Sequence, residues 1–91
     1  MKTAIIHQRF LVSTGISTDT RNIKPGSIFF ALKGANFNGN EFAAQAIAKG
    51  AICAIVDNKE AALNDKEYIV VKNTLEALQN LAKFHRKFLS I

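Results

Sequence analysis

The stretch Lys24-Pro25-Gly26-Ser27-Ile28-Phe29-Phe30-Ala31-Leu32-Lys33-Gly34 joins a proline-glycine turn to an apolar run rich in strand-forming residues. Proline presets φ near about −65° at the second position of a turn, and Gly26 is free to take the positive φ that a type II turn needs at the third. The run 27–32 is bounded by this turn on one side and by a glycine on the other. It is therefore predicted to be a strand.

A hydroxyl-rich cluster, Ser17-Thr18-Asp19-Thr20-Arg21, precedes this turn. If the turn makes the two segments double back on each other, Thr18, Thr20 and Arg21 will lie close to the Lys33-Gly34 end of the strand. Donors from two loops would then converge on one anionic or polar ligand. The plainer alternative is a turn in which Asp19 caps backbone N–H groups while Arg21 neutralises its carboxylate, and local chemistry favours that alternative.

Beyond the strand, the segment 34–40 is rich in Asn and Gly, which tolerate positive φ, and is predicted to be a loop. A helix is predicted over 41–49, capped by Asn40 and ended by Gly50. Phe37 in this polar loop either anchors the loop to the core or stacks on a flat ring. The sequence leaves these two roles equally open.

The run 51–56 is apolar without alternation, which is typical of a strand covered on both faces in a parallel sheet. A helical turn over 61–64 and a second buried strand over 68–71 follow. Asn73 and Glu76 form a capping-box start for the last helix. The spacing along that helix predicts a core-facing stripe of Leu75, Leu78, Leu81, Ala82, Phe88 and Leu89.

The N-terminal segment 3–12 places Ile6, Phe10 and Val12 on one side at helical spacing, although its β-branched residues leave a strand open. A short extended segment is expected over 15–21. The alternation of strands and helices predicts an α/β fold with a small, mostly parallel sheet flanked by helices and joined by right-handed crossovers. In such sheets, ligands collect where loops leave the carboxyl ends of strands.

With 91 residues, 48% of them hydrophobic and 21% charged, residues 1–91 are expected to fold as a single globular domain. No apolar run approaches the roughly 20 residues of a membrane-spanning helix, and we expect a cytoplasmic protein. Cys53 is the only cysteine, which excludes an internal disulfide, and it is predicted to be a core residue. His7 and His85 have no Cys, Asp or Glu at ligand spacing, so no metal site is expected.

The net charge of +5 is concentrated near the N-terminus, because residues 1–33 carry five cations against Asp19 alone, which is +4. This balance suits a nucleic acid, a phosphorylated small molecule or a solvated surface. Lys33 and Gly34 would set an ammonium and a backbone N–H against a phosphate. The chain lacks the G-x-x-x-x-G-K-[ST] pattern of a phosphate-binding P-loop, however, so the pair is a weak signal by itself.

From residue 17 to residue 56 the sequence resembles the N-terminal domain of the Mur ligases, the ATP-dependent amide-bond ligases that build the peptidoglycan precursor of the bacterial cell wall. The resemblance rests on the Ser-Thr-Asp-Thr-Arg run, on Ile-Lys-Pro-Gly-Ser-Ile-Phe-Phe-Ala-Leu-Lys-Gly, and on Asn-Phe-Asn-Gly-Asn-Glu-Phe before a helix that ends Lys-Gly-Ala. The Phe-Ala-Leu-Lys-Gly wording favours the branch that adds D-alanyl-D-alanine to UDP-N-acetylmuramoyl-tripeptide. The branch that adds the third amino acid is the alternative.

The resemblance implies that the domain holds the uridine and diphosphate of the nucleotide substrate. By position, the uracil and ribose would be surrounded by Thr18, Thr20, Ala35, Asn36 and Phe37, whereas Arg21, Lys33 and Gly34 would lie near the phosphates or shape the pocket, with Asp19 in the same cluster. Asn38 and Asn40 depart from the family pattern, which often has Asp and His there, so no contact is assigned to them.

The same resemblance implies a chain without catalytic residues or a cofactor of its own. ATP and Mg²⁺ would be used by the parent enzyme, whose central ATPase and C-terminal domains are absent from this sequence. Its partners would be UDP-N-acetylmuramoyl-peptide and those domains, and neither nucleic acid nor membrane. Two other classes stay open on the residues alone, a small basic RNA-binding domain and a protein-interaction module.

Overall fold

The computed structural model describes residues 2–32, 39–64 and 66–89. Helices and strands alternate along these residues, as predicted. The elements are α1 (Lys2–Leu11), β1 (Ile16–Ser17), the 3₁₀ turn η1 (Thr20–Asn22), β2 (Ile28–Phe30), η2 (Gly39–Phe42), α2 (Ala43–Ala48), β3 (Cys53–Val56), η3 (Lys59–Ala61), β4 (Tyr68–Val70) and α3 (Thr74–Leu89).

The four strands form one parallel sheet in the order β1-β2-β3-β4, which confirms the predicted fold class. Ile16 lies opposite Ile28, and Phe29 lies opposite Ala54 on the next strand. Because β1 and β2 are parallel, the predicted doubling back at the proline-glycine turn is wrong. The chain instead returns through η1 to the amino edge of the sheet before β2 begins.

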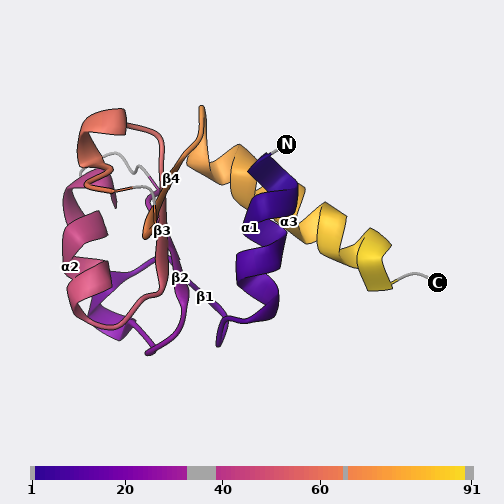
Figure 1. The fold of residues 1–91 in the computed structure, drawn as a ribbon, viewed down its shortest axis with the longest axis horizontal. Helices are drawn as coiled ribbons and strands as arrows, with labels where there is room; N and C mark the ends of the chain where they lie inside the picture. Colours follow the sequence, from indigo (N-terminus) through magenta and orange to yellow (C-terminus); the bar gives the residue numbers. More distant parts are fainter. Residues whose placement is uncertain (1, 33–38, 65, 90–91) are drawn as a thin grey trace.

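The order of the strands decides which helices cover which face. Parallel connections of one hand between successive neighbours all cross the same face of a sheet. In Figure 1, α2 and the two short 3₁₀ turns η1 and η3 lie on one side of the sheet. The opposite face is covered by α1 and α3, which come from the two ends of the chain (Figure 1). The fold therefore has three layers.

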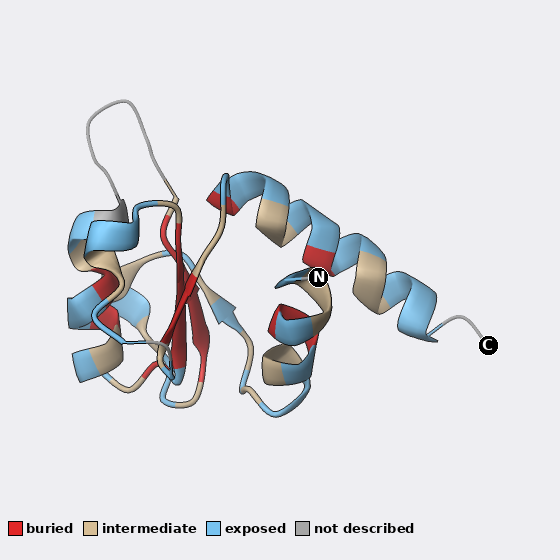
Figure 2. Cartoon of the chain, turned by 45° about the horizontal axis from the view of Figure 1, so that its top comes forward, coloured by how far each residue is buried: buried red, intermediate tan, exposed pale blue. Residues whose placement is uncertain are grey.

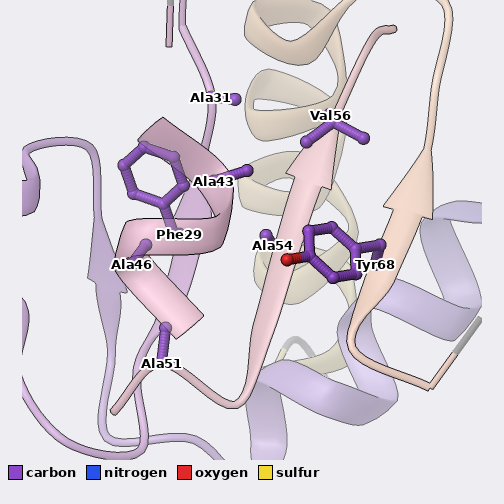
Figure 3. Packing of buried hydrophobic residues seen from close by; sticks show 8 residues of the cluster. All are labelled: Phe29, Ala31, Ala43, Ala46, Ala51, Ala54, Val56 and Tyr68. Atoms are coloured by element: carbon purple, nitrogen blue, oxygen red, sulfur yellow. The ribbon is translucent and has the colours of Figure 1, made fainter. Parts of the chain in front are cut away.

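Successive strand residues point to opposite faces and build two cores, and the buried strands stand out in the middle of Figure 2. Ile28 and Phe30 pack with Ile6 and Leu81 beneath α1 and α3. Phe29 faces α2 instead, in a cluster made mainly of alanines together with Val56 and Tyr68 (Figure 3). The small side chains of α2 let this helix lie close to the sheet.

The proline-glycine turn forms as the sequence predicts. Gly26 has φ +85°, and the Ser27 N–H donates to the Lys24 carbonyl at 3.0 Å. The Gly26 N–H also donates to the Gly50 carbonyl at 2.8 Å. A side chain at Gly50 would meet the Cα of Pro25 at 3.2 Å, so the two loops approach each other backbone to backbone.

Two predicted starts of helical segments are wrong. The α-helix α2 begins at Ala43 after the 3₁₀ turn η2, and its N-cap residue is Phe42, which makes no side-chain cap, rather than Asn40. Its end is as predicted, since Gly50 takes φ +117°. The helical turn expected over 61–64 lies at η3 instead, because the Asn58 side chain accepts the Glu60 N–H at 3.0 Å and starts the turn earlier.

The last helix begins where predicted, with Asn73 Oδ1 accepting the Glu76 N–H at 2.9 Å. The predicted core stripe is only partly correct. Leu81 is buried and Leu78 partly so, but the other four predicted members are exposed: Leu75, Ala82, Phe88 and Leu89. Much of this difference follows from the path of α3, whose last turns extend past α1 and away from the sheet (Figure 1).

The predicted helix at the N-terminus is confirmed, and the strand alternative is wrong, because α1 is helical over its whole length. Ile6 is buried and Phe10 partly so, as expected. Val12, which was expected on the same side, follows the end of the helix and is 78% exposed. His7 takes its place in the interior at 3% exposure.

Candidate functional site

The Ser-Thr-Asp-Thr-Arg run leaves the sheet at the carboxyl end of β1. Ser17 lies opposite Phe29 in the parallel ladder, so the carboxyl ends of β1 and β2 share one edge. That is the edge at which parallel sheets gather their ligands. Five predicted site residues follow β2 and lie outside the described residues: Lys33, Gly34, Ala35, Asn36 and Phe37. Their approach to the run stays a prediction.

Asp19 organises the run after β1. Its carboxylate Oδ1 accepts the Arg21 N–H at 2.9 Å and thereby caps η1. The same carboxylate pairs with the Arg21 guanidinium, with Nη2 to Oδ2 at 2.9 Å and Nε to Oδ2 at 3.1 Å. These are the contacts of the plainer alternative, a capped and neutralised turn. These contacts use only some of the hydrogen-bond donors of Arg21, since a guanidinium carries five N–H donors.

The charges of this pair follow from the same contacts. Hydrogen bonds from the Arg21 side chain, and then from its backbone N–H, hold the pKa of Asp19 below its ordinary value. The hydrogen bond to Asp19 raises the pKa of Arg21 in turn. The Arg21 side chain is 86% exposed, so its positive charge stands in solvent and is accessible to an anion.

Lys49 holds the run from the α2 side, which the sequence reasoning missed. Its Nζ donates to the Thr20 carbonyl at 2.7 Å, from just beyond the last turn of α2. The Ser17 hydroxyl adds a hydrogen bond to the Asp19 carbonyl at 3.2 Å. Among the predicted binding residues, Thr18 is exposed and Thr20 half-buried. The available signal for Lys49 was its position at the end of a helix, which does not specify a partner 29 residues away.

An open hollow lies at the same edge of the sheet, beyond β3 and β4. Its volume is about 500 Å³, and it is lined by Lys2, Lys59 and Lys72 together with Asp57 and Asn58. The Lys2 ammonium donates to the Val70 carbonyl, which ties α1 to the end of β4. Among the described residues, cationic side chains thus lie near the carboxyl ends of β1, β3 and β4.

The remaining reactive side chains are structural. Cys53 is fully buried in the sheet, and desolvation raises the pKa of its thiol, which confirms the predicted core role. His7 Nε2 lies 3.0 Å from His85 Nδ1, a pairing that the sequence reasoning did not anticipate.

In the part of the chain that the structure describes, no group of three or more His, Cys, Asp or Glu side chains is placed to hold a metal ion. No helix there is long and apolar enough to span a bilayer.

With this geometry in place, comparison with known proteins identifies the class. The family described as "Mur ligase family, catalytic domain" matches residues 12–86, and the chain belongs to the Mur ligase family. The match includes all four strands and most of α3. It confirms the resemblance that the sequence motifs indicated.

Individual relatives come from two branches of this family. A UDP-N-acetylmuramoyl-L-alanyl-D-glutamate–2,6-diaminopimelate ligase of Rickettsia conorii is 44% identical over 64 residues, which is 70% of this chain and 13% of the relative. A UDP-N-acetylmuramoyl-tripeptide–D-alanyl-D-alanine ligase of Haemophilus influenzae is 39% identical over 72 residues, 79% of this chain and 16% of the relative. The chain thus spans less than a fifth of the length of these relatives.

Similar solved structures belong to the second of these branches. MurF from Acinetobacter baumannii has a TM-score of 0.71 at 28% identity, covering 93% of this chain and 21% of that one. MurF ligase from Thermotoga maritima, solved in complex with ADP, has a TM-score of 0.72 at 26% identity, covering 81% of this chain and 17% of that one.

Proposed function

We propose that this chain binds the uridine diphosphate portion of UDP-N-acetylmuramoyl-tripeptide for a cytoplasmic ligase that adds D-alanyl-D-alanine during peptidoglycan precursor synthesis. The observation that carries the proposal is the position of the Ser-Thr-Asp-Thr-Arg run. It leaves β1 at the edge where β2 also ends, within a chain of the Mur ligase family. The similarity to solved MurF structures supports the choice of branch.

In this proposal the Asp19–Arg21 pair presents a cation at the rim of the nucleotide site. Asp19 orients the guanidinium through two nitrogens, and donors beyond those two are directed toward the diphosphate. The contacts from Ser17 and Lys49 keep the backbone of the run in one shape. A run that is already ordered loses less conformational entropy when the ligand binds.

Thr18 and Thr20 would contribute hydroxyl groups to the ribose and uracil. The loop residues Lys33, Gly34, Ala35, Asn36 and Phe37 would complete the site from the end of β2, in the roles that the family resemblance implies. Phe37 would stack on the uracil ring and Lys33 would lie near the phosphates. Each of these assignments is part of the proposal.

Catalysis would belong to the rest of a longer protein. The relatives are ligases, and one solved relative is in complex with ADP, which supports the use of ATP by the parent enzyme. ATP with Mg²⁺ would supply the activated acyl phosphate there. This chain would bind and orient the nucleotide end of the substrate and form no bond itself.

The alternative within the family is the ligase that adds the third amino acid. It is supported by the diaminopimelate-adding relatives, such as the Rickettsia conorii ligase, which is 44% identical to this chain over the matched residues. Both branches use a UDP-N-acetylmuramoyl-peptide, so the proposed nucleotide site is the same for either. An assay of the longer protein with D-alanyl-D-alanine and with diaminopimelate separates them.

The binding proposal is tested by titrating the ¹⁵N-labelled chain with uridine diphosphate and with UDP-N-acetylmuramic acid. We expect amide shifts at Thr18–Arg21 and Lys33–Phe37, and weaker shifts with uridine alone. Single-stranded RNA serves as the competing ligand. The proposal would be contradicted by a folded chain that binds neither nucleotide, or by one that binds RNA more tightly than the nucleotides with a steep salt dependence.

A further inference from the structure

A second candidate surface lies on the α1 and α3 side of the sheet, beside the edge strand β1. A groove of about 360 Å³ is lined mostly by apolar side chains from three elements, including Phe10 of α1, Ile16 of β1, and Leu78 and Ala82 of α3. Arg86 of α3 also lines it. An apolar hollow of this kind accepts one or two side chains of a binding partner.

The groove adjoins backbone groups that β2 does not use. β1 is the first strand in the sheet order, so only one of its sides is paired within the described residues. The Ile28 N–H donates to the Gly15 carbonyl at 2.9 Å. In a parallel ladder this bond directs the N–H and C=O of Ile16 away from β2, toward the open side. The Ile16 side chain shares the sheet face of Ile28 and lines the groove.

The elements around the groove carry almost only positive charge. Over α1, β1 and α3 there is a single acidic residue, Glu76, against five cations: Lys2, Arg9, Lys83, Arg86 and Lys87. Arg86 lies at the groove, and Lys83 lies one turn before it. A second copy of this chain would bring like charges together at this face. The face therefore suits an anionic partner.

We propose that the groove binds a short extended segment of another protein, acidic in charge and carrying an apolar side chain between its acids. The segment would hydrogen-bond to the open backbone groups of Ile16, place its apolar side chain in the groove, and set its carboxylates near Arg86. This combines the features of strand addition, in which backbone bonds give affinity and a pocket selects the side chain.

The shape of the face favours a peptide over an anionic membrane. The groove is concave, and its apolar residues line the hollow between α1, β1 and α3. A flat lipid surface would contact projecting side chains and leave the backbone of Ile16 unpaired. The groove is also separate from the proposed nucleotide site, because η1 and its Lys49 contact belong to the α2 side of the sheet (Figure 1).

The test measures fluorescence anisotropy of a fluorescein-labelled peptide of alternating glutamate and valine, titrated with the 91-residue chain. Arg86→Glu removes the cation at the groove, and Ala82→Phe fills the hollow. We expect each variant to bind the peptide about tenfold more weakly. Lys59→Glu and Ala44→Phe are the matched controls on the α2 side, and both should bind as the parent chain does.

Two further probes separate the outcomes. A peptide of glutamate alone should bind more weakly than the alternating peptide, because it lacks the apolar side chain. Peptide binding should also shift the amide signal of Ile16. Equal losses for Arg86→Glu and Lys59→Glu would reduce the effect to net charge and overturn the proposal. Binding to phosphatidylglycerol vesicles, with no affinity for the peptide, would assign the face to a membrane instead. The nucleotide titration is unaffected by either result.

Discussion

At the scale of single residues, Asp19 and Arg21 give one short run both its shape and its charge. Asp19 caps η1 through a backbone hydrogen bond and holds the guanidinium through a second set of bonds. The cap uses only the backbone N–H of Arg21 and does not need the Arg21 side chain. The two functions can therefore be separated by mutation.

Arg21→Ala should keep the cap and lose the cation. We expect the variant to fold normally and to bind uridine diphosphate roughly tenfold more weakly, because a charge-assisted hydrogen bond to phosphate is lost. Isothermal titration calorimetry measures the affinity, and Arg21→Lys should recover part of it. Unchanged affinity in a folded Arg21→Ala chain would remove this residue from the site.

The Asp19 carboxylate should titrate below its ordinary pKa of 3.8, because Arg21 stabilises its charged form. Because this pKa is lower in the folded state, the ionised Asp19 carboxylate stabilises the turn at pH values above the ordinary pKa. That contribution is lost as the pH falls through the lowered value. Carboxyl ¹³C shifts measured against pH report the titration. In Arg21→Ala the pKa should move back toward 3.8, and a titration unchanged by the mutation would contradict this assignment.

At the scale of elements, one buried hydrogen bond connects the last helix to the strand that precedes the predicted binding loop. The Thr74 hydroxyl, at the first residue of α3, donates to the Ala31 carbonyl at 2.9 Å. Thr74 is 3% exposed, so the bond is shielded from water. It holds the N-terminus of α3 against the end of β2, 43 residues earlier in the chain.

Thr74→Val should lower the free energy of unfolding by about 1 to 3 kcal/mol, because it leaves the buried Ala31 carbonyl without this donor. Ser27→Ala is the contrasting change. The Ser27 hydroxyl is buried and has no hydrogen-bond partner among the described residues. Removing it should leave stability equal or slightly higher. Urea unfolding of both variants checks the pair, and a larger loss for Ser27→Ala would show that this hydroxyl does have a partner.

The helices and strands also show which parts of the fold could be predicted from sequence patterns. The strands and the proline-glycine turn were predictable because local composition and backbone preference agree there, as Gly26 and Phe29 show. The start of α2 could not be predicted in the same way, since a 3₁₀ turn precedes it and Phe42 provides no side-chain cap. Helical spacing identified an apolar stripe on α3, but it could not show that Leu89, in the last turn, is exposed. The contacts of Lys49 and His7 depend on distant residues and have no local signal.

At the scale of the whole molecule, the sheet separates two cores that share its strands. The single tyrosine, Tyr68, packs in the cluster on the α2 side, whereas Ile6 is buried on the side of α1 and α3. Both clusters contain residues of β2, β3 and β4. A loss of packing in one core should therefore also destabilise the other.

Ile6→Ala should lower the free energy of unfolding by about 2 to 5 kcal/mol, since it leaves a cavity beneath α1. Tyr68 fluorescence, which reports on the opposite layer, should show the same shift in urea midpoint as far-UV circular dichroism. The exposed substitution Ile5→Ala on the same helix is the control and should cost much less. Two separate midpoints would show that the layers unfold independently.

The layer made by α1 and α3 unites the first and last helices of the described chain. During synthesis on the ribosome, α1 emerges before α3 and has no partner helix until α3 has also left the exit tunnel. Until then, the side of the sheet with Ile28, Phe30 and Ile55 lacks the cover that α3 provides. Vectorial folding should therefore pause at a half-covered intermediate until α3 emerges.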